Sequence, residues 1–339
     1  MMVKTKEVRE TTRILDEIIE CYKETNEEKK RDYKTYEQKF AQRVKKAMKE
    51  LSPLVEEAIK TLKIYKEEKR GNKPKLALKQ KVVLLLLKHL FGKSNRNMAN
   101  MLVIFTLLTD IDVSYKTVER LYSDWEVILV LHNLHMLLLQ KKGVKQADCG
   151  GDGTGYSLSV RKHYASSAQK LKEKVKIAKK VSENKKRVFV YSFLLMDITT
   201  RMYVAYGTSF YSEQEAFFQA IKMANDTNID IKSIRLDKYY SCQEYVRLLE
   251  KELGNVKITL LPKKNATVNG SWEWKRMMHD FVVDPISYLE DYFKRNQSES
   301  GFSEDKKRTG WKIMQKREDR IDTANFCNLL WHNLYWLND

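Results

Sequence analysis

The sequence predicts an α+β protein in which an all-α N-terminal region precedes a mixed α/β region. Residues 1–70 contain no glycine and one proline, Pro53, and the helical pattern continues to about residue 145. From residue 146 onward, apolar runs of strand length alternate with amphipathic helix patterns. A chain of 339 residues is long enough for two or three domains. We therefore expect a charged helical arm (1–70), a helical domain (71–145) and a mixed α/β domain (146–339).

The charge balance predicts a polyanionic partner. The chain has 63 Lys and Arg residues against 45 Asp and Glu residues, a net charge of +18, while 42% hydrophobic residues exclude a disordered protein. The most apolar run, Val127–Leu139, has thirteen residues and includes His132 and His135, whereas a membrane span needs about 20. No apolar run follows the charges of the N-terminus, so we expect no signal peptide. These features favour a cytoplasmic, nucleoid-associated protein that binds nucleic acid.

The arm is expected to form two long charged helices that meet near Pro53. Phe40, Val44, Met48 and Leu51 recur at the spacing of one face of an amphipathic helix. Such an arm could bind DNA, mediate dimerisation or form a solvated hairpin, and the pattern does not separate these roles.

The helical domain carries a candidate helix-turn-helix after a linker at Gly71–Pro74. A first helix is expected at Ser94–Leu102, and a second begins after Ser114, a good N-cap. Polar side chains on the outer face of the second helix could read a major groove. Two core helices of an all-α domain remain the alternative, and Val127–Leu139 is expected to close the domain as a buried helix. The candidate DNA-binding residues of the second helix are Tyr115, Lys116 and Arg120.

The mixed domain begins with a strand around 147–156 and continues with a hairpin whose turn contains Thr199 and Thr200. A helix capped by Ser212 follows, and the rest alternates strands with helices. A hairpin leading to βαβαβ and terminal helices is the order of a ribonuclease H-like mixed sheet. The expected elements are strands at 187–197, 201–207, 231–236 and 256–261, helices from Ser212 and at 244–253, and a helical region at 271–339.

Two aspartates are expected at strand ends. Asp152 lies among four glycines that would permit close backbone approach to a ligand, and Asp237 ends the strand at 231–236. Neither the dinucleotide-binding glycine spacing nor a phosphate-binding GxxxxGK loop is present. Carboxylates are the ligands that hard divalent cations prefer, and a pair of such cations can clamp a phosphodiester.

A third candidate lies on a helix near the C-terminus. Tyr292, Arg295, Glu299 and Lys306 are offset by 3, 7 and 14 residues, so they form one stripe of a helix. A carboxylate flanked by a hydroxyl and two cations suits a metal site against a phosphate backbone, although a charged helix face could contain the set by chance.

The sequence resembles the DDE transposases of bacterial and archaeal insertion sequences, in the subgroup marked by Tyr-x2-Arg-x3-Glu-x6-Lys. That signature is matched at Tyr292, Arg295, Glu299 and Lys306. The segments Asp152–Gly155 and Leu236–Ser241 look like the first and second aspartate motifs, and Leu261–Thr267 looks like the segment after the next strand. The resemblance covers roughly residues 146–339.

The resemblance implies a ribonuclease H-like fold that binds two Mg²⁺ or Mn²⁺ ions through Asp152, Asp237 and Glu299. Tyr292, Arg295 and Lys306 would then contact DNA phosphates. It further implies hydrolysis of phosphodiesters at the ends of a transposon, strand transfer into target DNA, and a homodimer on double-stranded inverted-repeat ends.

Several alternatives remain open from the sequence. Asp148 could replace Asp152, Glu304 lies near Glu299 but off its stripe, and Glu273 follows Asp237 at a spacing familiar from retroviral-type integrases. The tryptophans that flank Glu273, Trp272 and Trp274, could stack on an unpaired base or pack against the sheet. A non-transposing ribonuclease H-like nuclease, or an inactive helix-turn-helix protein derived from a transposase, are the alternative functions.

The basic excess is confined to residues 1–187. Residues 161–187 alone carry eleven basic and two acidic residues, whereas residues 188–339 carry 21 of each. We therefore expect residues 1–147 and 161–187 to bind DNA, and the C-terminal half to cut it.

Overall fold

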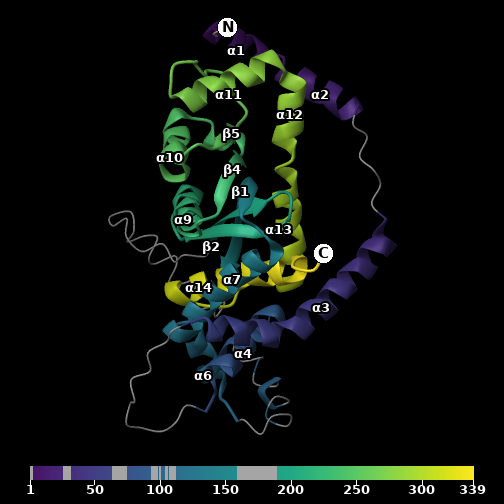
Figure 1. The fold of residues 1–339 in the computed structure, drawn as a ribbon, viewed down its shortest axis with the longest axis vertical. Coiled ribbons are helices and arrows are strands. Elements are labelled where there is room, and N and C mark those ends of the chain that lie inside the picture. Colours follow the sequence, from purple (N-terminus) through teal and green to yellow (C-terminus); the bar gives the residue numbers. More distant parts are fainter. Residues whose placement is uncertain are drawn as a thin grey trace, which may run out of the picture.

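A computed structural model describes residues 3–25, 32–62, 75–92, 98, 101–103, 106, 112–158 and 189–339 (Figure 1). Helices form both ends of the described chain, and a mixed sheet lies between them. The described elements are α1 (Thr5–Arg13), α2 (Leu15–Thr25), α3 (Tyr33–Lys60), α4 (Leu78–Leu90), α6 (Tyr115–Leu121), α7 (Trp125–Lys142), β1 (Gln146–Leu158), β2 (Phe189–Asp197), β3 (Tyr203–Ser209), α9 (Glu213–Asp226), β4 (Asp230–Arg235), the 3₁₀ helix η1 (Lys238–Tyr240), α10 (Gln243–Leu253), β5 (Lys257–Thr259), α11 (Trp272–Val283), α12 (Pro285–Phe293), α13 (Asn296–Thr309), β6 (Lys312–Ile313) and α14 (Glu318–Trp336).

The sheet has the strand order β3-β2-β1-β4-β5. Strands β1, β2 and β3 are antiparallel neighbours, and β4 and β5 run parallel to β1. This arrangement confirms the predicted hairpin followed by alternating strands and helices. The two-residue strand β6, which pairs with the end of β1 at Ser157 and Leu158, interrupts the region expected to be wholly helical.

The register between β1 and β4 brings the two candidate aspartates to the same level. Gly150 of β1 lies opposite Arg235 of β4. Asp152 and Asp237 each lie two residues beyond this pair. Neighbouring strands of a sheet are about 4.8 Å apart, so the two aspartates are close in space. The backbone of Asp237 is still extended, with φ −63° and ψ 155°. The pairing of a central strand with its parallel neighbour therefore assembles two thirds of the candidate site.

Helix α3 runs through Pro53 without a break, so the prediction of two helices meeting there is wrong. A proline inside a helix lacks one hydrogen-bond donor, which usually kinks or ends the helix. Here the apolar face offsets that loss, because Leu51, Leu54, Val55 and Ala58 are all buried around the proline. The predicted stripe was also partly misplaced, since Met48 is 40% exposed.

The first two helices lie far from α3, at the other end of the sheet (Figure 1). Helix α1 packs against α11, and α2 packs against α12. Arg9 donates a hydrogen bond to the Ala266 carbonyl at 3.4 Å, and the Val268 amide donates to Thr5 at 3.3 Å. The N-terminal arm is therefore not a solvated hairpin: it lies along the mixed domain at one end and along the helical domain at the other.

The second helix of the predicted helix-turn-helix is confirmed as α6. Ser114 caps it by accepting a hydrogen bond from the Thr117 amide, and Val118 and Leu121 are buried. Most of the predicted first helix, Ser94–Leu102, lies outside the described residues, so the motif itself stays a prediction. Helix α7 confirms the helix expected at Val127–Leu139, but only one face of it is buried, since Leu129 and Met136 are 39% and 37% exposed.

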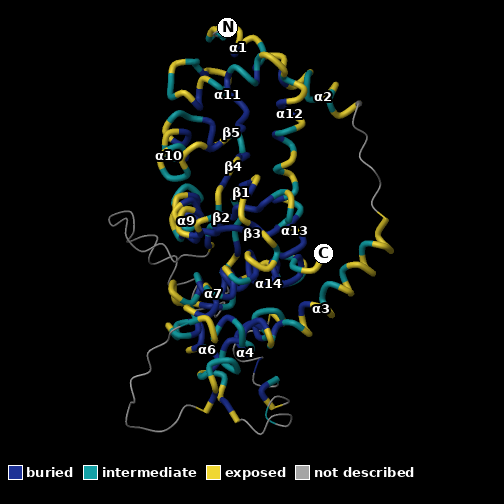
Figure 2. The backbone as a smooth tube through the Cα atoms, viewed as in Figure 1, coloured by how far each residue is buried: buried dark blue, intermediate teal, exposed yellow. Residues whose placement is uncertain are grey.

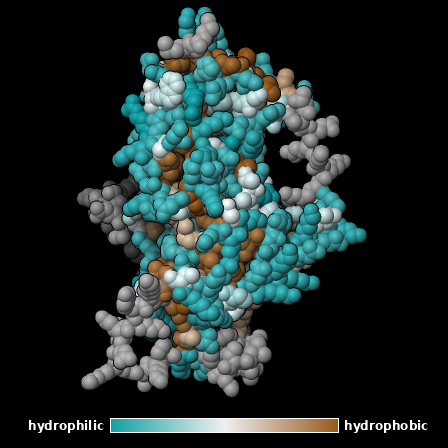
Figure 3. Space-filling model, viewed as in Figure 1, coloured by the Kyte–Doolittle hydropathy of each residue, from teal (hydrophilic) through white to brown (hydrophobic). Residues whose placement is uncertain are grey.

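The C-terminal helix α14 joins the helical domain to the sheet. It packs against α3, α4 and α7 on one side and β3 on the other, and nearly all of it is buried (Figure 2). Hydrophilic side chains cover most of the face seen in Figure 3, with hydrophobic atoms in a broken band along the long axis. In the described part of the chain, no helix has both the length and the apolar character needed to cross a bilayer.

Candidate active site

One guanidinium group contacts all three carboxylates that the sequence singled out. Arg295 Nη1 lies 2.9 Å from Glu299 Oε1 and 3.8 Å from Asp152 Oδ2, and Nη2 lies 4.0 Å from Asp237 Oδ1. These four residues come from β1, the end of β4 and the α12–α13 region. The fold therefore brings the three predicted carboxylates to a single point.

Each carboxylate is presented for a local structural reason. Asp152 lies within β1 and accepts a hydrogen bond from the Gly153 amide at 2.9 Å. Asp237 caps η1 by accepting from the Lys238 amide at 2.6 Å. Glu299 lies in the first turn of α13, where a negative charge interacts favourably with the helix dipole.

The predicted single stripe is built from two helices. Helix α12 ends at Phe293 and α13 begins at Asn296, so Arg295 lies in the turn between them. Arg295 and Glu299 nevertheless contact each other, and Lys306 donates from α13 to Thr154 Oγ1 of β1 at 2.5 Å. Arg295 and Lys306 therefore both reach β1.

The glycines of β1 admit the protein's own helix rather than leaving open space beside the strand. A Cβ atom at Gly150 would lie 2.7 Å from Ser298 Oγ and 3.3 Å from Arg295 Cα. A Cβ atom at Gly153 would lie 2.1 Å from the carboxyl carbon of Glu213. Because glycine has no Cβ, α13 can approach β1 closely enough for Arg295 to reach Asp152.

The surroundings of Asp152 disfavour its ionised form. Burial raises the pKa of Asp152 to about 6, and the negative charges of Glu299 and Asp237 add to that rise, while Arg295 opposes it. The Nε atom of Arg295 is buried and makes no hydrogen bond to any described residue. The negative charge of three ionised carboxylates exceeds the single positive charge of Arg295.

The remaining members of the signature lie beside this cluster. Tyr292 is only 3% exposed, and its ring lies 5.3 Å from the Arg295 guanidinium carbon. The buried ring therefore packs against the guanidinium group. Burial lowers the pKa of Lys306, whose ammonium also lies 5.0 Å from the ring of Trp311. Trp311 is 60% exposed, and no signal in the sequence marked it.

The donor set suits a hard divalent cation, although the site is arranged around arginine. Among the described residues, no group of three His, Cys, Asp or Glu side chains is close enough to hold a metal ion directly. Three carboxylates from separate elements supply the oxygen ligands that Mg²⁺ and Mn²⁺ prefer. In the structure the Arg295 guanidinium supplies the positive charge, so cation binding would require that side chain to move.

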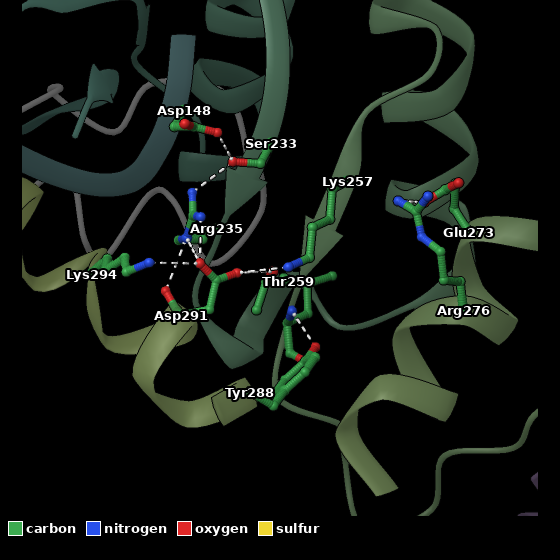
Figure 4. Close-up of polar contacts among 11 residues, drawn as sticks. Asp148, Ser233, Arg235, Lys257, Thr259, Glu273, Arg276, Tyr288, Asp291 and Lys294 are labelled. Carbon is green, nitrogen blue, oxygen red and sulfur yellow. Dashed lines mark hydrogen bonds and ion pairs between the residues drawn. The ribbon is translucent and has the colours of Figure 1, made fainter. Parts of the chain in front are cut away.

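The alternative carboxylates are engaged elsewhere. Asp148 accepts a hydrogen bond from Ser233 at 2.6 Å, and Glu273 is paired with Arg276 on α11 (Figure 4). Glu304 is buried and accepts from Tyr36 and Arg308 at 3.0 and 3.2 Å. Trp274 is buried and donates to the Thr267 carbonyl, whereas Trp272 is 76% exposed.

The three candidate DNA-binding residues of α6 lie away from the carboxylates, at the end of the molecule opposite α11 (Figure 1). Lys116 and Arg120 are exposed and Tyr115 is partly buried. The basic segment 161–187 lies outside the described residues.

Comparison with known proteins gives one informative match. The chain is 41% identical over 333 residues to a protein of Archaeoglobus fulgidus described as a probable transposase for insertion sequence element ISA1214. The match covers 98% of this chain and 96% of that relative. No family model and no solved structure matches the chain.

Proposed function

The chain belongs to the transposases of insertion sequences, and from this premise we propose that it is a DDE transposase with a ribonuclease H-like catalytic domain. It would bind transposon ends and catalyse metal-dependent phosphodiester hydrolysis followed by strand transfer. The observation that carries the proposal is the convergence of Asp152, Asp237 and Glu299 on Arg295. The strand order β3-β2-β1-β4-β5 is consistent with such a domain.

The proposed chemistry assigns each residue a role. Asp152, Asp237 and Glu299 would hold two Mg²⁺ or Mn²⁺ ions, which when bound activate the attacking water and stabilise the departing 3′ oxygen. Arg295, released from the carboxylates, and Lys306 would hold phosphate oxygens of the DNA backbone. The 3′ hydroxyl freed by the first cut would then attack a target phosphodiester in the same site, forming a new phosphodiester and releasing the target's own 3′ oxygen as a hydroxyl. No covalent protein–DNA intermediate is involved, so no serine or tyrosine nucleophile is needed.

The proposed partner is double-stranded DNA, both as inverted-repeat ends and as target. Lys116, Arg120 and Tyr115 on α6 would contribute to holding the ends. Because two ends are cut and joined together, we propose that the protein acts as a homodimer on DNA.

The test is cleavage of a duplex that carries the terminal repeat, in Mg²⁺ or Mn²⁺. Asp152→Asn, Asp237→Asn and Glu299→Gln should each abolish cleavage while leaving DNA binding largely intact, because they remove metal ligands and keep the shape of the side chains. Glu273→Gln is the matched control and should retain activity, since Glu273 is paired with Arg276 outside the site.

Wild-type cleavage by any of the three site variants would remove that residue from the proposed site. Joining of the cut 3′ end to a target duplex separates a transposase from a non-transposing nuclease. Metal-dependent nicking by the unaltered protein separates both from an inactive DNA-binding protein.

A further inference from the structure

A second polar cluster is centred on Asp291 of α12, as Figure 4 shows, and Asp291 precedes Arg295 of the candidate active site by four residues. The Asp291 carboxylate accepts from Arg235 Nη2 at 2.5 Å and Nε at 3.0 Å, and from Thr259 Oγ1 at 3.1 Å. Lys257 and Lys294 add ammonium groups at 3.3 and 3.4 Å. These contacts tie α12 to β4 and β5 through a carboxylate that is 16% exposed and an arginine that is 6% exposed.

The cluster extends to the central strand. Arg235 Nη1 donates to Ser233 Oγ at 2.8 Å, and Ser233 Oγ donates to Asp148 Oδ1 of β1 at 2.6 Å. We call the chain of contacts Asp148–Ser233–Arg235–Asp291 the Asp291 clamp. The clamp joins β1, β4 and α12, the elements that carry or lead directly into the residues of the candidate site.

The spacing along each element is the same. Asp148 precedes Asp152 by four residues on β1, and Ser233 precedes Asp237 by four residues on and beyond β4. Asp291 precedes Arg295 by four residues and Glu299 by eight. Four residues span about 13 Å in a strand and return the side chain to the same face. Asp291 lies in the last turn of α12, directly before the turn that holds Arg295. The clamp is therefore a second layer of contacts on the face that carries the carboxylates.

The Asp291 carboxyl group of the clamp is held in its ionised form. Burial alone would raise the pKa of Asp291, but hydrogen bonding and charge from Arg235, followed by the charge of Lys257, lower it to about 2. Buried ion pairs often add little net stability compared with apolar packing, because desolvation offsets their attraction. Such a pair can instead fix the relative positions of the elements that it joins, which matters at a site built from three separate elements.

We propose that Asp291 and Arg235 are positioning residues, whose ion pair fixes β4, which leads to Asp237, against the helices that carry Arg295 and Glu299. They touch neither substrate nor reacting atoms: they set the separation of the groups that do. This inference rests on the proposed function, since the carboxylates it aligns are the proposed metal ligands.

The test compares Asp291→Asn with a control that loses a similar ion pair elsewhere. Asp291→Asn should weaken binding of Mn²⁺ alone, measured by calorimetry without DNA, and should lower kcat for end cleavage, each about tenfold or more, as loss of outer-shell partners does at metal sites. Affinity for the DNA end should change less than about twofold, because the clamp makes no phosphate contact. Arg235→Lys, which keeps the charge but loses the forked contact, should give an intermediate effect and covers the case in which Asp291→Asn does not fold.

The matched control is Asp124→Asn. Asp124 pairs with Lys81 at 2.8 Å, its side chain is 22% exposed, and it joins α4 to α7 away from the sheet. Asparagine also preserves its role as N-cap of α7. This variant should leave Mn²⁺ affinity and kcat unchanged even where it lowers the melting temperature.

Mn²⁺ affinity that is the same in Asp291→Asn as in the unaltered protein would overturn the positioning role. Equal losses in Asp291→Asn and Asp124→Asn at matched melting temperatures would also overturn it, because the effect would then be general destabilisation. Failure of the unaltered protein to cleave DNA while it binds Mn²⁺ would overturn the proposed reaction instead.

Discussion

Asp152 lies in an environment unlike that of an ordinary surface carboxylate. Its pKa is raised to about 6, first by burial and then by the charges of Glu299 and Asp237. The folded protein therefore binds a proton there more tightly than the unfolded chain does, so stability falls as pH rises from about 4 to about 6. Above that window the full cost of an ionised Asp152 is present.

Asp152→Asn should therefore stabilise the metal-free protein at pH 8, by about 2–3 kcal/mol, since a rise of about two pKa units corresponds to that free energy. The gain should disappear near pH 3, below both pKa values, where Asp152 is protonated in the folded and in the unfolded protein. Thermal or urea unfolding of the two proteins in EDTA at both pH values measures it. A variant that is less stable than the unaltered protein at pH 8 would show that Asp152 is not a strained carboxylate.

At the scale of single residues, the sequence singled out three carboxylates that the fold brings together, and the set of Tyr292, Arg295, Glu299 and Lys306 beside them. It was insufficient to show that Arg295 contacts all three acids. That contact depends on the register of β1 against β4 and on the turn between α12 and α13, neither of which residue spacing reports. The exposed Trp311 was likewise invisible, because one tryptophan carries no periodic signal.

At the scale of elements, patterns set by local chemistry were predicted well. Ser114 and Ser212 cap α6 and α9 as expected, and Thr199 and Thr200 lie in the hairpin turn between β2 and β3. These features depend on the side chains of a few adjacent residues.

Elements set by tertiary contacts were predicted poorly. Pro53 lies inside α3 because the buried face around it stabilises the continuous helix. Strand β6 has only two residues and exists because it pairs with the end of β1, more than 150 positions earlier in the chain. Similarly, the glycines of β1 were expected to admit a ligand, whereas Gly150 admits α13.

At the scale of the whole molecule, the sequence suggests a division between a basic region that binds DNA and a balanced region that cuts it. The structure changes how that division can be tested. Removing residues 1–147 would uncover the buried side chains of α14, which pack against α3, α4 and α7, so a truncated chain would not report on DNA binding. Substitution of exposed basic residues avoids this problem.

The double variant Lys116→Ala/Arg120→Ala should weaken binding to transposon ends. It should reduce the slope of log affinity against log salt by about 2, as expected when two phosphate contacts are lost. Cleavage at saturating DNA should be unchanged, because α6 is remote from the carboxylates. Lys232→Ala/Lys251→Ala, which removes two exposed lysines from the electrically balanced half, is the control and should leave the slope unaltered. An unchanged slope in the α6 variant would argue against α6 as a DNA contact.

We propose that Asp152, Asp237 and Glu299 form one metal site, at which a bound cation would displace the Arg295 guanidinium. Anomalous X-ray scattering from Mn²⁺ in crystals of the protein bound to a transposon end tests this most directly. We predict Mn²⁺ peaks within about 2.0–2.4 Å of oxygens from all three carboxylates, with the Arg295 guanidinium withdrawn toward the DNA backbone. Mn²⁺ peaks beside other residues, or Arg295 still paired with all three carboxylates at saturating Mn²⁺, would show that these carboxylates do not form the metal site.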